Sequence, residues 1–412
     1  MDSLRDRMFW KFRMYGFLKN LRFFDPFLIL FFRGAGLTYL AIGSLYAIRE
    51  VSTNVLELPT GVIADAFGRR RAMVTAFASY LGSFTLFGFF SSYAAFAPAM
   101  VLFALGDALR SGTHKAMILE HLRQRGLEDH RVAYYGKTRA ASQFGSALAA
   151  VIGAGVVFWA GSYRVVFLFS MIPYVAALFL MFTYPKGLDG HVERIDRSWS
   201  GMFGRLRDTA RMSIASLKQH VLLRGLFSGS AFDAVFRATK DYLQPILQAQ
   251  ALAVPLFLTL QAERRVAVIV GGIYFVIYLA TSFASSCAGA VRDRAPSLSK
   301  AINGIYLVGM GLLAATGVAG WIGWEAGAIA AYLLLYAVQN VRRPMIVGYV
   351  SEHIDHRMMA TGLSVETQLR TVMTAILAPM AGLLADRLGV GVAILVIGSL
   401  GFIGYPLARV QE

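Results

Sequence analysis

The segment at residues 57–71 reads ELPTGVIADAFGRRR and joins two apolar stretches of the chain. Gly61 and Gly68 permit a close helix approach and a tight turn, because neither carries a Cβ. Asp65 can accept hydrogen bonds from the amides of a helix N-terminus or pair with an arginine. The run Arg69–Arg71 can anchor the turn at lipid headgroups. We therefore expect a tight basic turn between two membrane helices.

The composition of the whole chain is that of a membrane protein. Its 412 residues are 57% hydrophobic, 13% aromatic and 16% charged, with a mean hydropathy of +0.56, whereas a soluble domain carries about 25% charged residues. These values exclude an ordinary soluble enzyme, a disordered chain and a collagen-like chain. The one cysteine, Cys287, excludes an intramolecular disulfide.

Apolar stretches of about 20 residues are long enough to cross a bilayer as helices. The chain has twelve of them, which predicts an all-α membrane protein with twelve transmembrane helices in two six-helix bundles. The predicted spans lie near residues 23–38, 40–64, 72–92, 95–119, 138–160 and 164–184, then 221–247, 266–290, 300–318, 324–348, 362–385 and 390–408.

The polar segments between and around these spans predict the domain organisation. Residues 185–220 form the longest polar segment and are expected to be a cytoplasmic linker between bundles at residues 23–184 and 221–408. Residues 1–22 hold six Lys or Arg without a small-residue cleavage site, so we expect an amphipathic cytoplasmic segment and not a cleaved signal peptide. We expect residues 409–412 to form a short cytoplasmic tail.

Membrane topology explains most of the formal charge of +16. With the N-terminus taken as cytoplasmic, 27 of the 40 Lys and Arg residues fall on the cytoplasmic side and four on the opposite side, as the positive-inside rule requires. We expect cytoplasmic termini, contacts with anionic membrane lipid and a bacterial inner membrane. Nucleic-acid binding is excluded, because no loop is long enough to fold a basic extramembrane domain.

The segment quoted first resembles the signature between the second and third helices of the major facilitator superfamily (MFS). The pattern G-x-x-x-D-x-x-G-R-[KR]-[KR] is matched in full, and the predicted spans and basic linker extend the resemblance over the whole chain. It implies two bundles that rock about one central site and a latch that closes the cytoplasmic side. The implied latch residues are Gly61, Asp65, Gly68, Arg69, Arg70 and Arg71.

Internal repeats favour the same fold, because such transporters are built from repeated halves. The glycine-to-aspartate spacing recurs at Gly289 and Asp293, and the full G-x-x-x-D-x-x-G spacing recurs after the eleventh predicted span, at Gly382, Asp386 and Gly389. A second repeat relates the fourth and tenth spans. It aligns Arg110, Glu120 and His121 with Arg342, Glu352 and His353, and Asp107 with Gln339.

Nine Lys and Arg residues lie inside the predicted spans, not counting those within the first four residues of a span, which are counted with the loops. Each costs about 3 kcal/mol at a helix centre, so exposing all of them to lipid would cost on the order of 25 kcal/mol. They must face a watery cavity, pair or snorkel. The family resemblance implies that spans one, four, seven and ten line the cavity, and seven of the nine fall there. These seven are the candidate substrate-binding residues: Arg33, Arg110, Lys115, Arg237, Lys240, Arg342 and Arg343.

Acidic residues within the spans suggest proton coupling, although some can be structural. Asp107, Asp233 and Asp241 stand three or four residues from a span arginine and can form pairs on one helix face. Glu50, Asn54 and Glu57 form a polar face, and Glu50 is either a proton carrier or half of a packed ion pair with Arg49. Further candidates are Glu366 and His114, although a lone histidine is more often structural. The candidate proton-coupling residues are Glu50, Glu57, Asp107, His114, Asp233, Asp241 and Glu366.

These features together predict a monomeric secondary transporter that moves a small solute, with an anion favoured, by alternating access coupled to protons. An efflux pump for drugs or amphiphiles is an alternative, weakened because the fifth span lacks the Gly-Pro pair typical of drug–proton antiporters of the superfamily. A membrane sensor or scaffold that moves nothing is another. We expect no enzyme activity, no cofactor and no metal, since the sequence has no nucleophile–base set, phosphate-binding loop or metal-ligand spacing.

Overall fold

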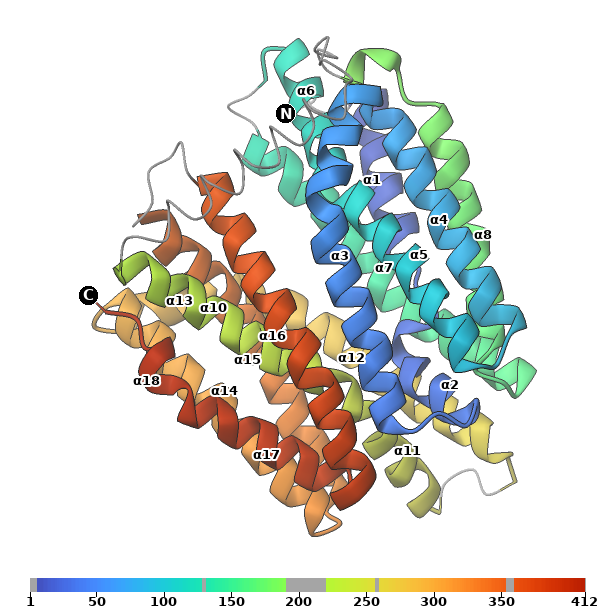
Figure 1. The fold of residues 1–412 in the computed structure, drawn as a ribbon, viewed down its shortest axis with the longest axis vertical. Coiled ribbons are helices and arrows are strands. Elements are labelled where there is room, and N and C mark those ends of the chain that lie inside the picture. Colours follow the sequence, from blue (N-terminus) through green and yellow to red (C-terminus); the bar gives the residue numbers. More distant parts are fainter. Residues whose placement is uncertain (1–5, 128–130, 190–219, 256–258, 353–358, 412) are drawn as a thin grey trace. The chain divides into compact units, whose positions relative to one another are not determined.

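The structure, a computed structural model, describes residues 6–127, 131–189, 220–255, 259–352 and 359–411. Within these ranges the chain is helical and has no β-strand (Figure 1). Its contacts divide it into two units. The first comprises Met1–Phe27 and Ser52–Leu206, and the second comprises Leu28–Val51 and Arg207–Glu412. Most of the predicted linker, residues 190–219, lies outside the described part.

The N-terminal unit consists of helices that begin and end close to the predicted spans. In Figure 1, α4, α5 and α8 run side by side, and α4 packs against both of the others. A cluster of buried aromatic rings, which includes Phe84, Phe103 and Phe167, fills the space between them. The elements are α1 (Arg7–Lys19), η2 (Asp25–Phe27), the C-terminal part of α3 (Tyr39–Phe67), α4 (Arg69–Phe89), α5 (Tyr93–Ser111), α6 (Thr113–Gln124), α7 (Arg131–Ala160), α8 (Val165–Phe182) and η4 (Lys186–Asp189).

The C-terminal unit is larger than the predicted bundle, chiefly because it includes residues 28–51. This segment contacts α11 and α16 within the unit. The elements are α2 (Leu28–Gly34), the N-terminal part of α3, α10 (His220–Thr239), η6 (Lys240–Tyr242), α11 (Leu243–Ala253), α12 (Ala262–Ser286), α13 (Ala288–Asp293), α14 (Leu298–Trp321), α15 (Glu325–Glu352), α16 (Met359–Leu388), α17 (Val390–Ile403) and α18 (Tyr405–Ala408).

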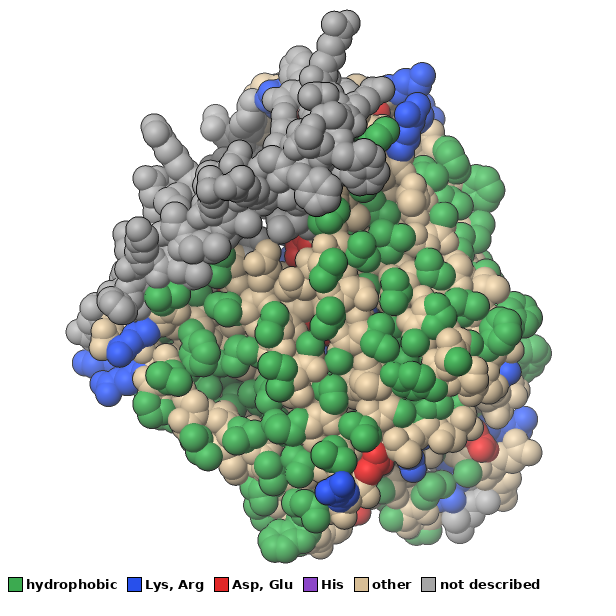
Figure 2. Space-filling model, in the orientation of Figure 1, with side chains coloured by type: hydrophobic (Ala, Val, Ile, Leu, Met, Phe, Trp, Pro, Cys, Tyr) green, Lys and Arg blue, Asp and Glu red, His purple; other side chains and the backbone are tan. Residues whose placement is uncertain are grey.

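Seven of the helical segments are long and apolar enough to cross a membrane: 69–89, 93–124, 136–160, 165–182, 262–285, 298–321 and 365–388. Figure 2 shows hydrophobic side chains spread over the visible face, and Lys and Arg side chains concentrated toward helix ends. Large side chains such as Trp159, Phe283 and Ile403 are more than two-thirds exposed, as expected for side chains that face lipid. The remaining predicted spans fall on shorter or more polar helices.

The first 22 residues are packed more tightly than the sequence predicted. Within them, α1 packs against α7 and α8, and Phe9, Phe12 and Tyr15 are buried. The close approach depends on Gly145 and Gly153 of α7, where an added Cβ would come within 2.6 Å of the Phe17 carbonyl oxygen in α1 and within 2.5 Å of the Phe23 carbonyl oxygen just after the first segment. The predicted boundary at residues 22–23 therefore falls inside a packed unit. Because α1 contains several basic residues, its hydropathy did not indicate that it packs against other helices.

Candidate functional site

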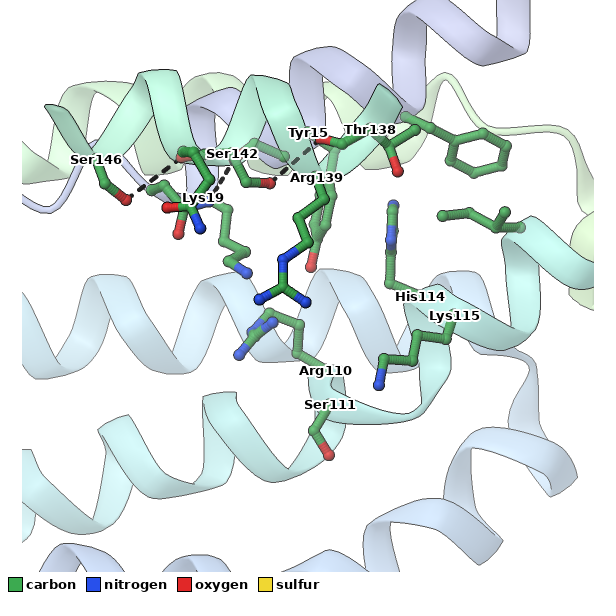
Figure 3. Close-up of a pocket in the computed structure, with 15 residues that line it drawn as sticks. Tyr15, Lys19, Arg110, Ser111, His114, Lys115, Thr138, Arg139, Ser142 and Ser146 are labelled. Atoms are coloured by element: carbon green, nitrogen blue, oxygen red, sulfur yellow. Dashed lines mark hydrogen bonds between the residues drawn. The ribbon is translucent and has the colours of Figure 1, made fainter. Parts of the chain in front are cut away.

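A cavity of about 250 Å³ lies in the N-terminal unit between α1, the α5–α6 junction and α7. Four cationic side chains line it, and none of its lining residues is Asp or Glu. In Figure 3, the ends of Lys19 and Arg139 point from one wall toward Arg110 on the other. Hydroxyl groups complete the polar lining. The cations are Lys19, Arg110, Lys115 and Arg139, and the hydroxyl residues include Ser111, Thr138, Ser142 and Ser146.

Local helix geometry explains why these side chains meet. The helix breaks at Gly112, between the end of α5 and the start of α6, so Arg110 and Lys115 lie on either side of the break. On α7, Arg139, Ser142 and Ser146 are three or four residues apart and therefore share one face. Lys19 is the last residue of α1. The cavity is thus lined by side chains from α1, from the α5–α6 junction and from one face of α7.

Arg110 is held by a network of hydrogen bonds. Its Nη2 donates to Asp107 Oδ1 at 3.1 Å, and its Nε donates to the Tyr80 hydroxyl at 3.0 Å. That hydroxyl in turn donates to the same Asp107 oxygen at 2.5 Å. Only 18% of the Arg110 side chain is exposed. The network fixes the guanidinium at the cavity wall before any ligand arrives, which lowers the entropy cost of binding.

Arg22 belongs to this network, although the sequence placed it in the cytoplasmic segment. Its Nη2 lies 3.5 Å from Asp107 Oδ1, and its Nε donates to the Tyr174 hydroxyl at 3.0 Å. Its guanidinium also lies over the Phe103 ring, 5.2 Å from the centroid. Asp107 therefore contacts two arginines and a tyrosine. The missed signal is the position of Arg22 just before the apolar run that begins at Phe23.

His114 is packed like a structural residue. Its ring stacks on Tyr15, with 3.6 Å between ring centroids, and meets Phe12 edge-on at 5.4 Å. The side chain is buried, and its Nε2 has no hydrogen-bond partner among the described residues. His114 and Tyr15 together form an aromatic wall of the cavity. The structural alternative for this histidine is thus favoured over a proton-coupling role.

A second polar cluster lies in the C-terminal unit, where α10, α15 and α16 meet. Asp233 accepts a hydrogen bond from Gln339 Nε2 and lies 3.5 Å from Arg370 Nη1. Arg342 is 2% exposed and donates to the Ser228 hydroxyl at 2.8 Å. No ion pair joins Arg342 to a carboxylate within the described ranges.

The predicted Arg110–Arg342 repeat receives structural support. Arg110 donates to the hydroxyl of buried Tyr80, on α4. Arg342 lies over the ring of buried Tyr306, on α14, 5.4 Å from its centroid. Each arginine therefore contacts a tyrosine on the helix that precedes its own. The two aligned glutamates differ, because Glu120 pairs with Arg123 whereas Glu352 is exposed. Of the two aligned histidines, His121 pairs with Asp6, and His353 lies outside the described residues.

Glu366 differs from the other predicted carboxylates of the C-terminal unit. Within the described part of this unit it forms no ion pair. Its carboxylate packs against α10 at Gly229, where an added Cβ would come within 2.5 Å of Oε1. By contrast, Glu50 lies 3.0 Å from Arg49 and 3.9 Å from Arg237, and Asp241 lies 2.6 Å from Lys240. For Glu50 the structure has the packed ion pair that the sequence left as an alternative.

Several predicted residues neither line the cavity nor make the contacts of the second polar cluster. Arg33 donates to the Leu37 carbonyl oxygen at 2.8 Å and lies over the Tyr39 ring, and Arg343 is exposed. Lys240 pairs with its neighbour Asp241, and Glu57 accepts a long hydrogen bond from Ser111 at 3.4 Å. The structure thus brings together Arg110, Lys115 and His114 at the cavity and Asp233, Arg342 and Glu366 in the second cluster.

The predicted latch segment forms the turn between α3 and α4. Gly68 has φ of +100° and precedes α4. Asp189, from η4, accepts a hydrogen bond from the Arg70 amide at 2.7 Å, and an added Cβ at Gly68 would lie 3.1 Å from its carboxylate carbon. At Gly61 an added Cβ would meet nothing within 4 Å, so the expected close approach is not found there. The side chain of Asp65 lies outside the described part.

We expect Gly68→Ala to lower the Tm by a few degrees, because alanine is strained at positive φ and its Cβ would crowd Asp189, together costing about 1–2 kcal/mol. Gly61→Ala is the matched control, since its site has space for the methyl group. Thermal unfolding of the purified variants measures the difference. Equal Tm values for the two variants would contradict the assignment of Gly68 as the conformationally required glycine.

The sequence profile described as Major Facilitator Superfamily matches residues 20–368. The chain belongs to this superfamily. Its members are membrane transporters and not enzymes, in agreement with the expectation from the sequence. A curated relative, the uncharacterized MFS-type transporter YxaM of Bacillus subtilis (strain 168), is 32% identical over 90 residues. Those residues are 22% of this chain and 23% of the relative, so the match spans less than a quarter of that protein.

Solved structures with the MFS fold are similar over nearly the whole chain. The nucleoside transporter NupG has a TM-score of 0.74 at 10% identity, with 99% of this chain and 100% of that chain covered. A D-xylose-proton symporter has a TM-score of 0.68 at 15% identity, with 98% of this chain and 96% of that chain covered. A POT family transporter in complex with 5-aminolevulinic acid has a TM-score of 0.67 at 14% identity, with 97% of this chain and 93% of that chain covered. The predicted all-α membrane fold is confirmed, while the count of twelve spans remains a prediction.

Proposed function

We propose that this MFS member is a monomeric secondary transporter of a bacterial inner membrane that moves a small anionic solute by alternating access, coupled to protons. The observation that carries the proposal is the cavity of the N-terminal unit, lined by four cations and by no Asp or Glu. Its volume of about 250 Å³ is below the range of about 300–1,000 Å³ usual for drug-sized ligands. A compact solute is therefore favoured.

The charge balance of the cavity supports an anion. Among the described residues, no carboxylate lies within ion-pair distance of Lys19, Lys115 or Arg139. Arg110 and Arg22 share the single carboxylate of Asp107. The group around the cavity therefore carries an excess of positive charge that a bound anion would neutralise. Because several cations are uncompensated, a dianion would gain more than a monoanion.

The same ion pairs weigh against the efflux alternative. A pump for cationic drugs needs a carboxylate that is available to the drug, and four of the predicted carboxylates are already in contact with cations. Opening any of these pairs would leave a partly buried arginine or lysine uncompensated. The pairs are Asp107–Arg110, Glu50–Arg49, Asp241–Lys240 and Asp233–Arg370.

Proton coupling is best assigned to Glu366. A carboxyl group without an ion-pair partner can take up and release a proton without breaking a salt bridge. Glu366 satisfies this condition within the described part of its unit. The charged residues close enough to influence its charge are Asp233, Arg370, Arg343 and Arg342. Its protonation state could thereby alter the packing of α16 against α10 at Gly229.

Lys19→Gln and Arg139→Gln are each expected to raise the KM for a transported dianion about tenfold, since each removes one Coulombic contact in a partly solvated cavity. A monoanion should lose less. Lys137→Gln is the matched control, because this residue of α7 does not line the cavity. Initial uptake rates at several solute concentrations give the KM values. An equal rise for Lys137→Gln would contradict a local role of the cavity.

The proposal is tested by uptake of labelled small solutes into proteoliposomes. A panel of dianions, monoanions, neutral solutes and cations is compared with empty vesicles, with and without an inward proton gradient. We expect uptake of one or more anions, increased by the gradient. Export of cationic dyes would favour the efflux alternative, and reconstituted protein that moves none of the panel would favour the sensor or scaffold.

A further inference from the structure

The cavity of the N-terminal unit has hydrogen-bond acceptors beside its four cations. Ser142 and Ser146 of α7 line it, as does Asn20, the residue that caps the C-terminal end of α1. Figure 3 shows both serines on the same helix as Arg139. Binding of an anion by the cations gives these three side chains no role. Their hydrogen bonds indicate what else the solute must carry.

Both serines already donate their hydroxyl hydrogens within α7. The Ser142 hydroxyl donates to the Thr138 carbonyl oxygen at 3.5 Å, and the Ser146 hydroxyl donates to the Ser142 carbonyl oxygen at 3.3 Å. A serine that bonds to the carbonyl group four residues earlier keeps two lone pairs on its oxygen that can accept hydrogen bonds. Toward a ligand, both serines therefore act as acceptors.

Asn20 adds a third acceptor. Its Nδ2 donates to the Gly16 carbonyl oxygen at 2.8 Å, and its side-chain oxygen accepts no hydrogen bond from the described residues. Gly16 lies against α7, because an added Cβ there would come within 2.6 Å of the Ser142 hydroxyl oxygen. The close contact of the two helices brings the asparagine next to the serines. Asn20, Ser142 and Ser146 together form what we call the acceptor strip.

The acceptor strip extends along α7 away from Arg139. Because a helix rises about 1.5 Å per residue, Ser142 lies about 4.5 Å and Ser146 about 10.5 Å beyond Arg139 along the axis. The Arg139 guanidinium points across the cavity toward Arg110 (Figure 3). An anionic group between the two arginines therefore reaches the strip only through a chain of further solute atoms.

The charges of the cavity restrict which donors that chain can carry. An ammonium group would donate to the acceptor strip, but the four cations of the cavity would repel it. A purely aliphatic chain would cover the three oxygens without giving them hydrogen bonds, which costs the free energy of removing them from water. Hydroxyl groups avoid both costs, because they donate and carry no charge.

We propose that the transported anion carries hydroxyl groups along its carbon chain and that these groups donate to Asn20, Ser142 and Ser146. The proposal rests on the proposed anion site and specifies the remainder of the solute. An anionic group of the solute lies between Arg110 and Arg139, and the hydroxylated chain follows α7. The cations select for charge, and the acceptor strip distinguishes a hydroxylated acid from an aliphatic acid of the same length.

A matched pair of dicarboxylates tests the proposal on the purified full chain. Galactarate and adipate are dianions with the same carbon chain, and only galactarate carries hydroxyl groups. We expect the wild-type protein to bind galactarate at least about tenfold more tightly than adipate, as expected for two or three neutral hydrogen bonds. Galactitol has the hydroxyl groups without the charge and should not bind. Isothermal titration calorimetry gives the Kd values.

Ser142→Ala and Ser146→Ala identify the atoms responsible. Each should weaken galactarate binding about fivefold, the effect of one neutral hydrogen bond, and leave adipate binding unchanged. Alanine is favourable inside a helix, so both variants should fold. Ser79→Ala is the matched control, because Ser79 donates to the Thr75 carbonyl oxygen at 2.9 Å in the same way but does not line the cavity. It should bind both dianions as the wild type does.

The outcomes separate this proposal from the anion site on which it rests. Equal affinity of the wild type for galactarate and adipate would overturn the role of the hydroxyl groups and leave the anion site intact. Equal losses of both dianions in Ser142→Ala and Ser146→Ala would also overturn it, because the serines would then act through helix packing. If neither dianion binds, or if galactitol binds as tightly as galactarate, the anion site itself is contradicted, and the proposal with it.

Discussion

Arg110→Gln is expected to reduce anion uptake about 100-fold, because a hydrogen-bonded contact between a guanidinium and an anion contributes on the order of 3 kcal/mol. The variant should still fold. Asp107 keeps its contacts with Arg22 and the Tyr80 hydroxyl after the substitution, so no buried carboxylate is left without partners. Initial uptake rates in proteoliposomes, normalised to the amount of reconstituted protein, measure the loss.

Arg123→Gln provides the matched control for this change. Arg123 is an arginine of the same unit that pairs with Glu120 at an exposed position and does not line the cavity. It should retain uptake, since exposed salt bridges contribute about 0–1 kcal/mol. Wild-type rates in Arg110→Gln, for every anion that the protein transports, would remove Arg110 from the site and with it the main support for an anionic solute.

Glu366→Gln is expected to abolish accumulation driven by a proton gradient while solute exchange continues. Glutamine resembles the protonated carboxyl in shape but cannot release a proton, so the step that couples solute to protons is lost. The cation cavity is in the other unit and keeps all its lining residues. Net accumulation under an inward proton gradient is compared with exchange of labelled for unlabelled solute at equal pH.

Glu263→Gln controls for loss of a carboxylate from the same unit, because Glu263 is exposed in the first turn of α12. It should show normal accumulation and normal exchange. Undiminished gradient-driven accumulation in Glu366→Gln would show that this residue does not carry the coupled proton. Loss of exchange along with accumulation would point to a structural role at the contact with Gly229.

Much of the fold could be predicted from hydropathy and one motif, because membrane helices show their length and apolar character directly in the sequence. The Gly61–Arg71 segment correctly indicated the superfamily, and two of the seven residues predicted to bind substrate, Arg110 and Lys115, line the same cavity. The Arg110–Arg342 repeat also corresponds to similar contacts with tyrosines. These successes depend on local patterns or on fixed spacing along one helix.

The errors arise where a residue's partner is distant in sequence. The charges of α1 suggested a segment outside the bundle, but this helix packs against α8 and, at Gly145, against α7 of the N-terminal unit. Arg22 and Lys19 were consequently counted as topology signals, and Arg139 was counted among loop residues. Spacing also could not reveal that Glu50 has Arg237 within reach, 187 positions further along the chain, while Glu366 has no ion pair in the described part of its unit.

The central claim, that the cation cavity binds the solute, is tested most directly by ligand-induced thermal stabilisation of the purified protein. A ligand that binds the native state raises the Tm in proportion to its occupancy. The account predicts that one or more small anions, and dianions above monoanions, raise the Tm of wild-type protein and of Lys137→Gln but not of Arg110→Gln. Stabilisation by cations alone, or equal stabilisation of Arg110→Gln by the same anions, would contradict it.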